Sequence, residues 1–195
     1  MIRVLIVLLV AMASVPTAAQ HGGHGAAAPY AGQQVRAIKS LSAEDVEELR
    51  RGGGWGLAKV AELNGVPGPA HVLELADRIG LSAEQVASVR AVFERMRVAA
   101  TREGERLIGL EMALETSFRE RTVTDETLRR ALGEIERSRL ILRYIHLAAH
   151  LETASLLMPP QIALYNDLRG YGADPCRDVP VGHDPVLWRR HNGCR

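Results

Sequence analysis

The chain has 195 residues, of which 24 are Lys or Arg and 23 are Asp or Glu, and 47% are hydrophobic. That hydrophobic fraction is too high for a disordered chain and too low for a polytopic membrane protein. A formal charge of +1 lacks the basic excess with which proteins displace counterions from phosphates, so a general nucleic-acid binder is also excluded.

The N-terminal residues have the pattern of an export signal. Arg3 precedes the apolar run 4–12, and small residues lead up to Gln20. This run is shorter than the roughly 20 residues that a transmembrane helix needs, which favours a cleaved signal peptide over an uncleaved membrane anchor. We expect residues 1–19 to be removed by cleavage after Ala19 and the protein to enter a bacterial periplasm.

The segment that follows, residues 20–40, is predicted to be a flexible leader because its first half is rich in glycine and alanine. It contains His21 and His24, and imidazoles close to a free N-terminus can chelate copper or nickel. A metal-binding leader and a plain flexible leader therefore both remain open.

Capping residues, prolines and glycines divide the rest of the chain into predicted helices. Ser42, Ser82 and Thr124 are each placed to cap a helix, while Pro69 and Pro159 suit first turns. In chain order the predicted helices cover residues 42–51, 55–63, 69–79, 82–118, 124–157 and 159–170. No segment alternates as a strand does, so the predicted fold is all-α.

The two long predicted helices carry apolar residues at spacings of three and four, the pattern of helices that pack along one side. The short turn between them predicts an antiparallel hairpin in which facing residue numbers sum to about 242–244. Glu103 is then expected to face Arg139. Apolar residues remain on the outer side, at Leu110, Ile141 and Ile145, and indicate either a dimer or a surface for client proteins.

The glycine-rich run 52–56 precedes a short predicted helix, as phosphate-binding loops do. It lacks the Gly-Lys-Ser/Thr sequence that holds phosphate and magnesium, so we interpret it as a flexible connection between helices.

Catalytic motifs are also missing from the sequence, which contains no Gly-x-Ser-x-Gly motif and no reactive Cys–His arrangement. The sequence therefore predicts a protein that is not an enzyme.

Two cysteines, Cys176 and Cys194, flank a tail rich in proline and glycine that shows no helical periodicity. In an oxidising compartment they are expected to form a disulfide, which stabilises such a loop by about 3 kcal/mol in the chain-entropy model. The alternative is a zinc site completed by His183 and His191, although this spacing matches no standard zinc finger. We favour the disulfide and define residues 172–195 as an irregular, disulfide-closed tail.

Two matching phrases stand at helix starts, Leu81-Ser-Ala-Glu-Gln85 and Leu157-Met-Pro-Pro-Gln161. They resemble the LTxxQ motifs of the periplasmic Spy/CpxP family, which includes the heavy-metal-resistance sensors related to CnrX. The second phrase departs from the usual pattern, since Met158 stands where threonine is more usual. The resemblance covers roughly residues 68–171.

This resemblance implies a hooked, dimeric helical hairpin, with the helical domain over residues 41–171. Members of the family act as ATP-independent chaperones, as repressors of an envelope-stress sensor kinase, or as binders of zinc, nickel, cobalt or copper. We therefore expect a homodimer whose further partners are unfolded client proteins or a membrane sensor protein.

Histidine positions favour the metal-binding branch of this family. His146 and His150 stand at i and i+4 on the second long helix, so both imidazoles lie on one face and could chelate one ion. In that branch such a pair is completed from the short helix before the hairpin, which here carries His71 and Glu74. The resemblance thus implies a site for Zn²⁺, Ni²⁺, Co²⁺ or Cu²⁺ made of these four residues. The alternative is that His146 is a hydrogen-bonded core residue.

The function expected from these features is a periplasmic metal sensor or buffer in heavy-metal resistance. A chaperone and a regulatory adaptor of an envelope-stress sensor kinase are the alternatives.

Overall fold

The computed structural model of the chain describes residues 28–172, 176–179 and 181–194. Its contacts divide the chain after Gln34, and the architecture below concerns the second unit, which starts at Val35. The first unit contributes only turns and the start of the 3-10 helix Gln33–Val35 to the described residues. The predicted signal peptide, its cleavage site and the leader histidines His21 and His24 lie outside the described ranges.

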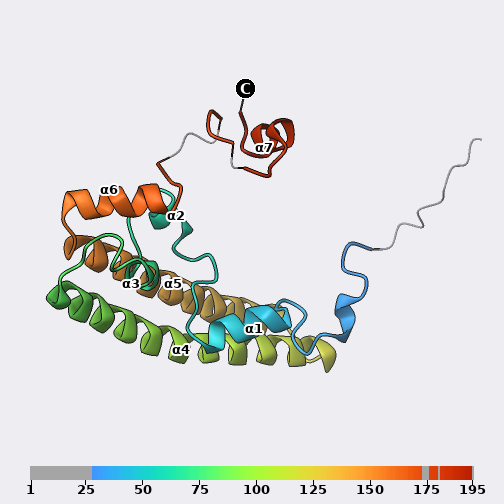
Figure 1. Ribbon diagram of the computed structural model, residues 1–195. Helices are drawn as coiled ribbons and strands as arrows, with labels where there is room; N and C mark the ends of the chain where they lie inside the picture. The colour runs from blue at the N-terminus through green and yellow to red at the C-terminus, as the bar shows by residue number, and fades with distance from the viewer. Residues whose placement is uncertain (1–27, 173–175, 180, 195) are drawn as a thin grey trace, which may run out of the picture. The chain divides into compact units, whose positions relative to one another are not determined.

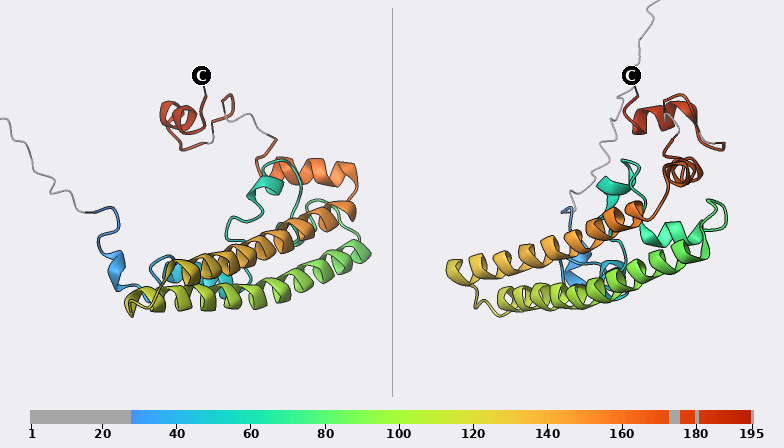
Figure 2. Two further views of the ribbon diagram at one scale, coloured as in Figure 1. Left: turned by 180° about the vertical axis from the view of Figure 1, so that it is seen from behind. Right: turned by 90° about the vertical axis from the view of Figure 1, so that its left-hand side faces the viewer.

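Two long antiparallel helices dominate the second unit (Figure 1 and Figure 2): α4 spans Ala83–Arg119 and α5 spans Asp125–Ser155. Both begin where capping was predicted, because the hydroxyls of Ser82 and Thr124 accept backbone N–H groups of the first turn. The described residues form helices and no strand, which confirms the all-α hairpin. None of these helices is apolar over a length that could cross a bilayer.

Apolar side chains fill the seam between α4 and α5. The most deeply buried of them are Ala100, Leu107, Ile135 and Leu142. Burial of one side chain of leucine size contributes about 1.5–3 kcal/mol, so this cluster holds the hairpin closed. Leu110 and Ile145, which were expected on the outer side of the hairpin, pack against the same cluster, and Ile141 is also partly buried.

The prediction that Glu103 faces Arg139 in this seam is wrong. Ser138 occupies the buried position instead, and its hydroxyl donates to the Glu103 carboxylate across 2.6 Å. Arg139, one residue further round the helix, reaches the Glu111 carboxylate at 2.6 Å. Because successive helical residues differ by about 100° in direction, an error of one residue in register gives a charged side chain a different neighbour.

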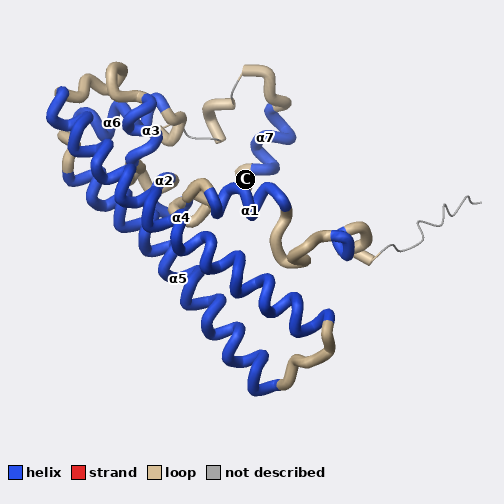
Figure 3. The backbone as a smooth tube through the Cα atoms, turned by 90° about the horizontal axis from the view of Figure 1, so that it is seen from below, coloured by secondary structure: helices blue, strands red, loops and turns tan. Residues whose placement is uncertain are grey.

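The short helix α1, Ala43–Arg50, packs against α4 (Figure 3), and its approach depends on a glycine. Leu49 of α1 is buried, and its carbonyl oxygen lies so near Gly104 of α4 that a Cβ added there would be 2.4 Å away. Residues before the helix also pack, since Ile38 and Leu41 are buried in the same core cluster. The packed part of the chain therefore reaches back to Ile38.

Two short helices, α2 (Lys59–Glu62) and α3 (Pro69–Glu74), are shorter than predicted. The helix predicted over 55–63 starts late because Trp55 and Gly56 have φ angles of +42° and +69°, which an α-helix does not include. The helix predicted from residue 69 gives way to hydrogen-bonded turns after α3 ends, and apolar side chains of these turns still pack into the core.

At the open end of the hairpin the two helix-starting phrases meet. Gln85 and Gln161 exchange two hydrogen bonds through their side-chain amides, at 2.9 and 3.0 Å, and Gln161 also accepts the backbone N–H of Met158. Helix α6, Pro159–Leu168, is held in this way beside the start of α4. A second buried apolar cluster at this end consists of Val72, Ile79, Val89, Leu157 and Tyr165.

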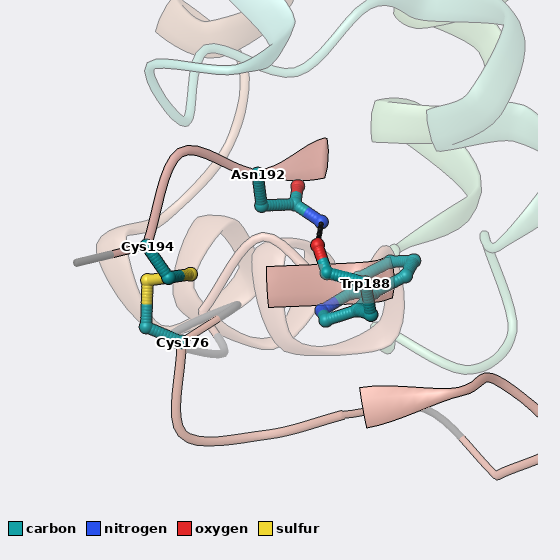
Figure 4. Close-up of a disulfide and its surroundings, with 4 residues drawn as sticks. All are labelled: Cys176, Trp188, Asn192 and Cys194. Atoms are coloured by element: carbon teal, nitrogen blue, oxygen red, sulfur yellow. Dashed lines mark hydrogen bonds between the residues drawn. A yellow bond between two sulfur atoms is a disulfide. The ribbon is translucent and has the colours of Figure 1, made fainter. Parts of the chain in front are cut away.

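The C-terminal tail contains a disulfide and a helix. Cys176 and Cys194 are joined as predicted, with their Cα atoms 5.5 Å apart (Figure 4), so the alternative in which both sulfurs bind zinc is wrong. The prediction of an irregular tail is also wrong, because α7 spans Pro185–His191. Asp184 caps this helix by accepting two backbone N–H groups, and a helix of seven residues is too short to show clear periodicity.

Gly104→Ala is expected to lower the free energy of unfolding by about 1–3 kcal/mol, because the added methyl group meets the Leu49 carbonyl oxygen at 2.4 Å. Gly109→Ala on the same helix is the matched control. No atom lies within 4 Å of its Cβ position, so this substitution should stabilise the protein by about 0.5–1 kcal/mol. Urea unfolding followed by circular dichroism measures both, and equal stabilisation by the two would contradict the close approach of α1.

Candidate functional site

A cavity of about 710 Å³ lies between the short helices and the hairpin. Its wall is formed by the end of α1, the glycine-rich loop 52–56, α2, the start of α3, parts of α4 and α5, and two residues that follow α6, Arg169 and Tyr171. A volume of this size is typical of small-molecule sites, which measure about 300–1,000 Å³. Three of the four predicted metal ligands, His71, His146 and His150, lie in this wall.

His146 of α5 is almost completely buried, with 3% of the residue exposed. Its Nε2 atom has no hydrogen-bond partner among the described residues. Burial and the neighbouring imidazole of His150 lower the pKa of His146 below its usual value, so the ring is neutral at neutral pH. A buried polar atom without a partner costs about 1–3 kcal/mol, and a ligand that bonds to this nitrogen would recover that free energy.

His150 lies one helical turn further along α5 and is fixed by the connection between α2 and α3. Its Nδ1 atom is 2.8 Å from the carbonyl oxygen of Val66. Because a carbonyl only accepts hydrogen bonds, Nδ1 is the nitrogen that carries the proton in this bond, and the corresponding tautomer has its lone pair on Nε2. A Cβ added at Gly68 would come within 2.5 Å of that Nε2, so only glycine lets the backbone pass this close to the ring.

Of the two metal ligands expected from α3, one lines the cavity and the other does not. His71 lines the cavity, and its Nδ1 lies 3.1 Å from the carboxylate of Glu62. Glu74, the last residue of α3, is exposed and does not line the cavity. The carboxylate that lies beside His71 in the cavity wall is therefore that of Glu62 on α2, and Glu74 does not take the expected place. The sequence contained no signal for Glu62, because its contacts join α2 to residues that follow it by up to about a hundred positions.

The Glu62 carboxylate connects three parts of the chain. Its Oε1 atom accepts hydrogen bonds from Arg169 at 2.8 Å, Tyr171 at 2.9 Å and Tyr165 at 3.3 Å, besides its contact with His71. Partial burial opposes ionisation of Glu62, but the bonds from Tyr171 and Arg169 and the charge of His71 hold its pKa below the usual value. Burial raises the pKa of Tyr165, which therefore remains protonated and keeps its donor. We call this set the Glu62 network.

Charged groups in the cavity wall are largely paired with one another. Glu48 and Glu62 are each paired with an arginine of the wall. Two further cations, Lys59 and Arg97, also line the cavity, and Arg97 pairs with a glutamate outside it. Arg169, the partner of Glu62, has an Nε atom that is buried and without a hydrogen-bond partner in the described part of the chain. Both carboxylates of the wall are therefore compensated, and the guanidinium of Arg169 has a buried N–H without a partner among the described residues.

Close packing holds the glycine-rich loop in the wall. Gly52 is buried with a φ of +69°, and a Cβ added there would be 2.7 Å from the carbonyl oxygen of Arg97 on α4. Trp55 in the same loop donates its indole N–H to Asp45 at 2.8 Å. Gly52 thus allows the start of the loop to lie directly on α4, a role that the interpretation of the run as a flexible connection did not include.

The donors of the cavity do not form a complete metal site in this arrangement. No three His, Cys, Asp or Glu side chains within the described ranges are grouped closely enough to hold an ion. The two imidazoles of α5 fit part of such a site, because His146 is neutral and has an unused Nε2, and His150 carries its proton on Nδ1.

No protein-family model, curated protein or solved structure matches this chain.

Glu62→Gln is expected to lower the free energy of unfolding by about 1–3 kcal/mol at neutral pH, because the Glu62 network loses its charged acceptor. Folding lowers the pKa of Glu62, so its contribution is fully present above the usual value of 4.5 and is lost as the pH falls through the lower folded-state pKa. Urea unfolding of both proteins between about pH 3 and 7 should therefore show a difference that shrinks under acid conditions.

Glu74→Gln is the control for this experiment, since Glu74 is exposed and outside the cavity. It should change the unfolding free energy by less than about 0.5 kcal/mol at any of these pH values. An effect of Glu74→Gln as large as that of Glu62→Gln would contradict the assignment of Glu62 to the site.

Proposed function

We propose that this chain is an exported, non-enzymatic metal-binding protein of the Spy/CpxP type, a sensor or buffer in heavy-metal resistance. In this proposal His146 and His150 bind one divalent ion in the cavity. Imidazole nitrogens suit borderline ions, so Zn²⁺, Ni²⁺, Co²⁺ and Cu²⁺ are the candidates.

The unpartnered Nε2 of His146 is the observation that carries this proposal. A histidine that served only the packing of the core would be expected to have its buried nitrogen hydrogen-bonded, as almost all buried polar groups do. His146 instead keeps a buried nitrogen without a partner among the described residues, although the residue lines a cavity one helical turn from a second imidazole.

His150 supports the same function through its bond to Val66. Metal-binding histidines usually donate their second ring N–H to a carbonyl or carboxylate, which fixes the tautomer and the orientation of the ring. The hydrogen bond from Nδ1 to the Val66 carbonyl has this form. It leaves Nε2 as the nitrogen available for an ion.

His71 is the third proposed ligand, because it lines the same cavity. To reach an ion it would exchange its contact with Glu62 for one with the metal. Glu74 leaves the predicted ligand set, since it is exposed and outside the wall. If His71 bound the ion, the Glu62 network would lose its contact with this imidazole. The metal-bound and metal-free proteins would then differ in a contact that links α2, α3 and α6, so ion binding would affect the positions of these helices.

The proposed compartment is the periplasm. The Cys176–Cys194 disulfide is consistent with an oxidising environment, and residues 1–19 have the composition of a cleaved signal peptide.

An apolar stripe on α5 favours a second candidate function, an ATP-independent chaperone or an adaptor that binds a membrane sensor protein. Leu140, Tyr144 and Leu151 are 67%, 69% and 67% exposed. Their spacings of four and seven residues bring all three to the same side of the helix. Exposed apolar side chains in such a row are typical of protein contacts, with a client, a sensor or a second copy in a homodimer.

Calorimetric titration of Zn²⁺ into the processed protein, residues 20–195, tests the metal function. His146→Ala combined with His150→Ala should weaken binding by more than about 100-fold, because loss of a single supporting residue already costs about 10–100-fold in metal sites. His183→Ala combined with His191→Ala removes the same number of imidazoles from the tail and should leave binding unchanged. Circular dichroism checks that both variants are folded. Unaltered affinity in the first variant would end the proposal.

Suppression of the aggregation of a reduced model client, measured by light scattering without metal, tests the second candidate. Leu140→Glu combined with Leu151→Glu should abolish suppression, because charges in the stripe oppose apolar contact. Val98→Glu on α4 makes a similar change at a residue that is 63% exposed outside the stripe and is the control. If the wild-type protein does not delay aggregation, or if the control variant loses as much activity, the stripe is not a client site.

A further inference from the structure

We infer that the cavity takes the metal ion more tightly as a complex with a small organic polycarboxylate than as a bare ion. This inference rests on the proposed function, since it assigns the metal to the same pair of imidazoles. It adds the chemical class of the second component, which would fill the remainder of the cavity.

The cavity offers few donors and much room for an ion. Within the described part of the chain no group of three His, Cys, Asp or Glu side chains is placed to hold a metal, which leaves the imidazoles of His146 and His150 as the first donors. The candidate ions take four or more ligands, so further donors must come from another molecule. A volume of about 710 Å³ matches the size of an organic ligand and far exceeds that of an ion.

The charges of the wall oppose a bare dication. Glu48 is paired with Arg51 and Glu62 with Arg169, so neither carboxylate is free to compensate a bound ion. Lys59 of α2 adds a further positive charge to the wall. A metal complex with a net negative charge would be attracted to this surface, whereas a free dication would be repelled.

Arg169 provides an anchor for the organic component. Its Nη2 atom donates to Glu62 at 2.8 Å, but its buried Nε atom has no partner in the described chain. A guanidinium N–H is a strong donor to carboxylates, and the resulting bond is charge-assisted. A polycarboxylate that placed one carboxylate at this Nε and its other oxygens on the ion would satisfy Arg169 while the ion satisfies His146.

Apolar side chains in the cavity wall also favour an organic ligand. Trp55, Phe93 and Met96 line the cavity together with the histidines. A hydrated ion makes no favourable contact with such surfaces, whereas the carbon skeleton of a chelator can pack on them.

Nickel and citrate test this inference. The processed protein is dialysed against Ni²⁺ alone, citrate alone, or equimolar nickel citrate, and the retained nickel and citrate are measured by elemental analysis and native mass spectrometry. We expect citrate to be retained only together with nickel, in equal amounts. The variant with His146→Ala and His150→Ala should retain neither.

Charge variants separate the two components of the complex. Lys59→Glu reverses an exposed charge of the wall and should weaken citrate retention roughly threefold or more, while Ni²⁺ alone is retained at least as well. Arg137→Glu makes the same change at an exposed residue of α5 that does not line the cavity, and it should have no effect. Arg169→Lys removes the Nε donor and should also lower citrate retention. If this variant does not fold, Lys59→Glu decides the matter.

The outcomes separate this inference from the proposed metal function. Retention of nickel without citrate from the mixture overturns the inference and leaves the metal function in place. Failure to retain nickel under any condition overturns the inference, and it overturns the metal function as well if the Zn²⁺ titration also shows no binding. Retention of citrate without nickel, unchanged by the histidine substitutions, would identify a site for organic anions and would likewise overturn both.

Discussion

The contact between α5 and the connection from α2 to α3 is the one on which the cavity depends. His150 donates its Nδ1–H to the carbonyl oxygen of Val66, and the absence of a side chain at Gly68 lets the backbone lie against the ring. Because α2 and α3 both contact α5, this connection sets where the two short helices stand on the hairpin. Glu62 and His71 on the short helices and His146 on α5 all line the cavity that results.

Polar groups around the cavity fall into two classes. Most are satisfied within the protein, as Glu62 shows by accepting several hydrogen bonds on one oxygen atom. The exceptions in the wall are the Nε2 of His146 and the Nε of Arg169, which are buried and lack partners among the described residues. Native proteins retain few such atoms, and the proposed metal complex assigns a ligand to both of these.

The histidines of the cavity and the partner of His71, Glu62, come from elements of very different length. His146 and His150 belong to a helix of 31 residues that packs along α4, whereas His71 and Glu62 belong to helices of six and four residues. Helices this short have little stability of their own and depend on tertiary contacts. In the proposed function, an ion that drew His71 away from Glu62 would therefore act on the part of the fold that is most sensitive to single contacts.

Features that depend on neighbouring residues followed directly from the sequence. Ser42, Ser82 and Thr124 cap their helices through bonds to residues three positions away, and the hairpin follows from a short turn between two periodic segments. The choice of Glu62 over Glu74 was decided only in the tertiary structure. It depends on how each short helix is rotated about its axis and on where its connection meets α5, and a change of one residue in either turns a carboxylate from the cavity to solvent.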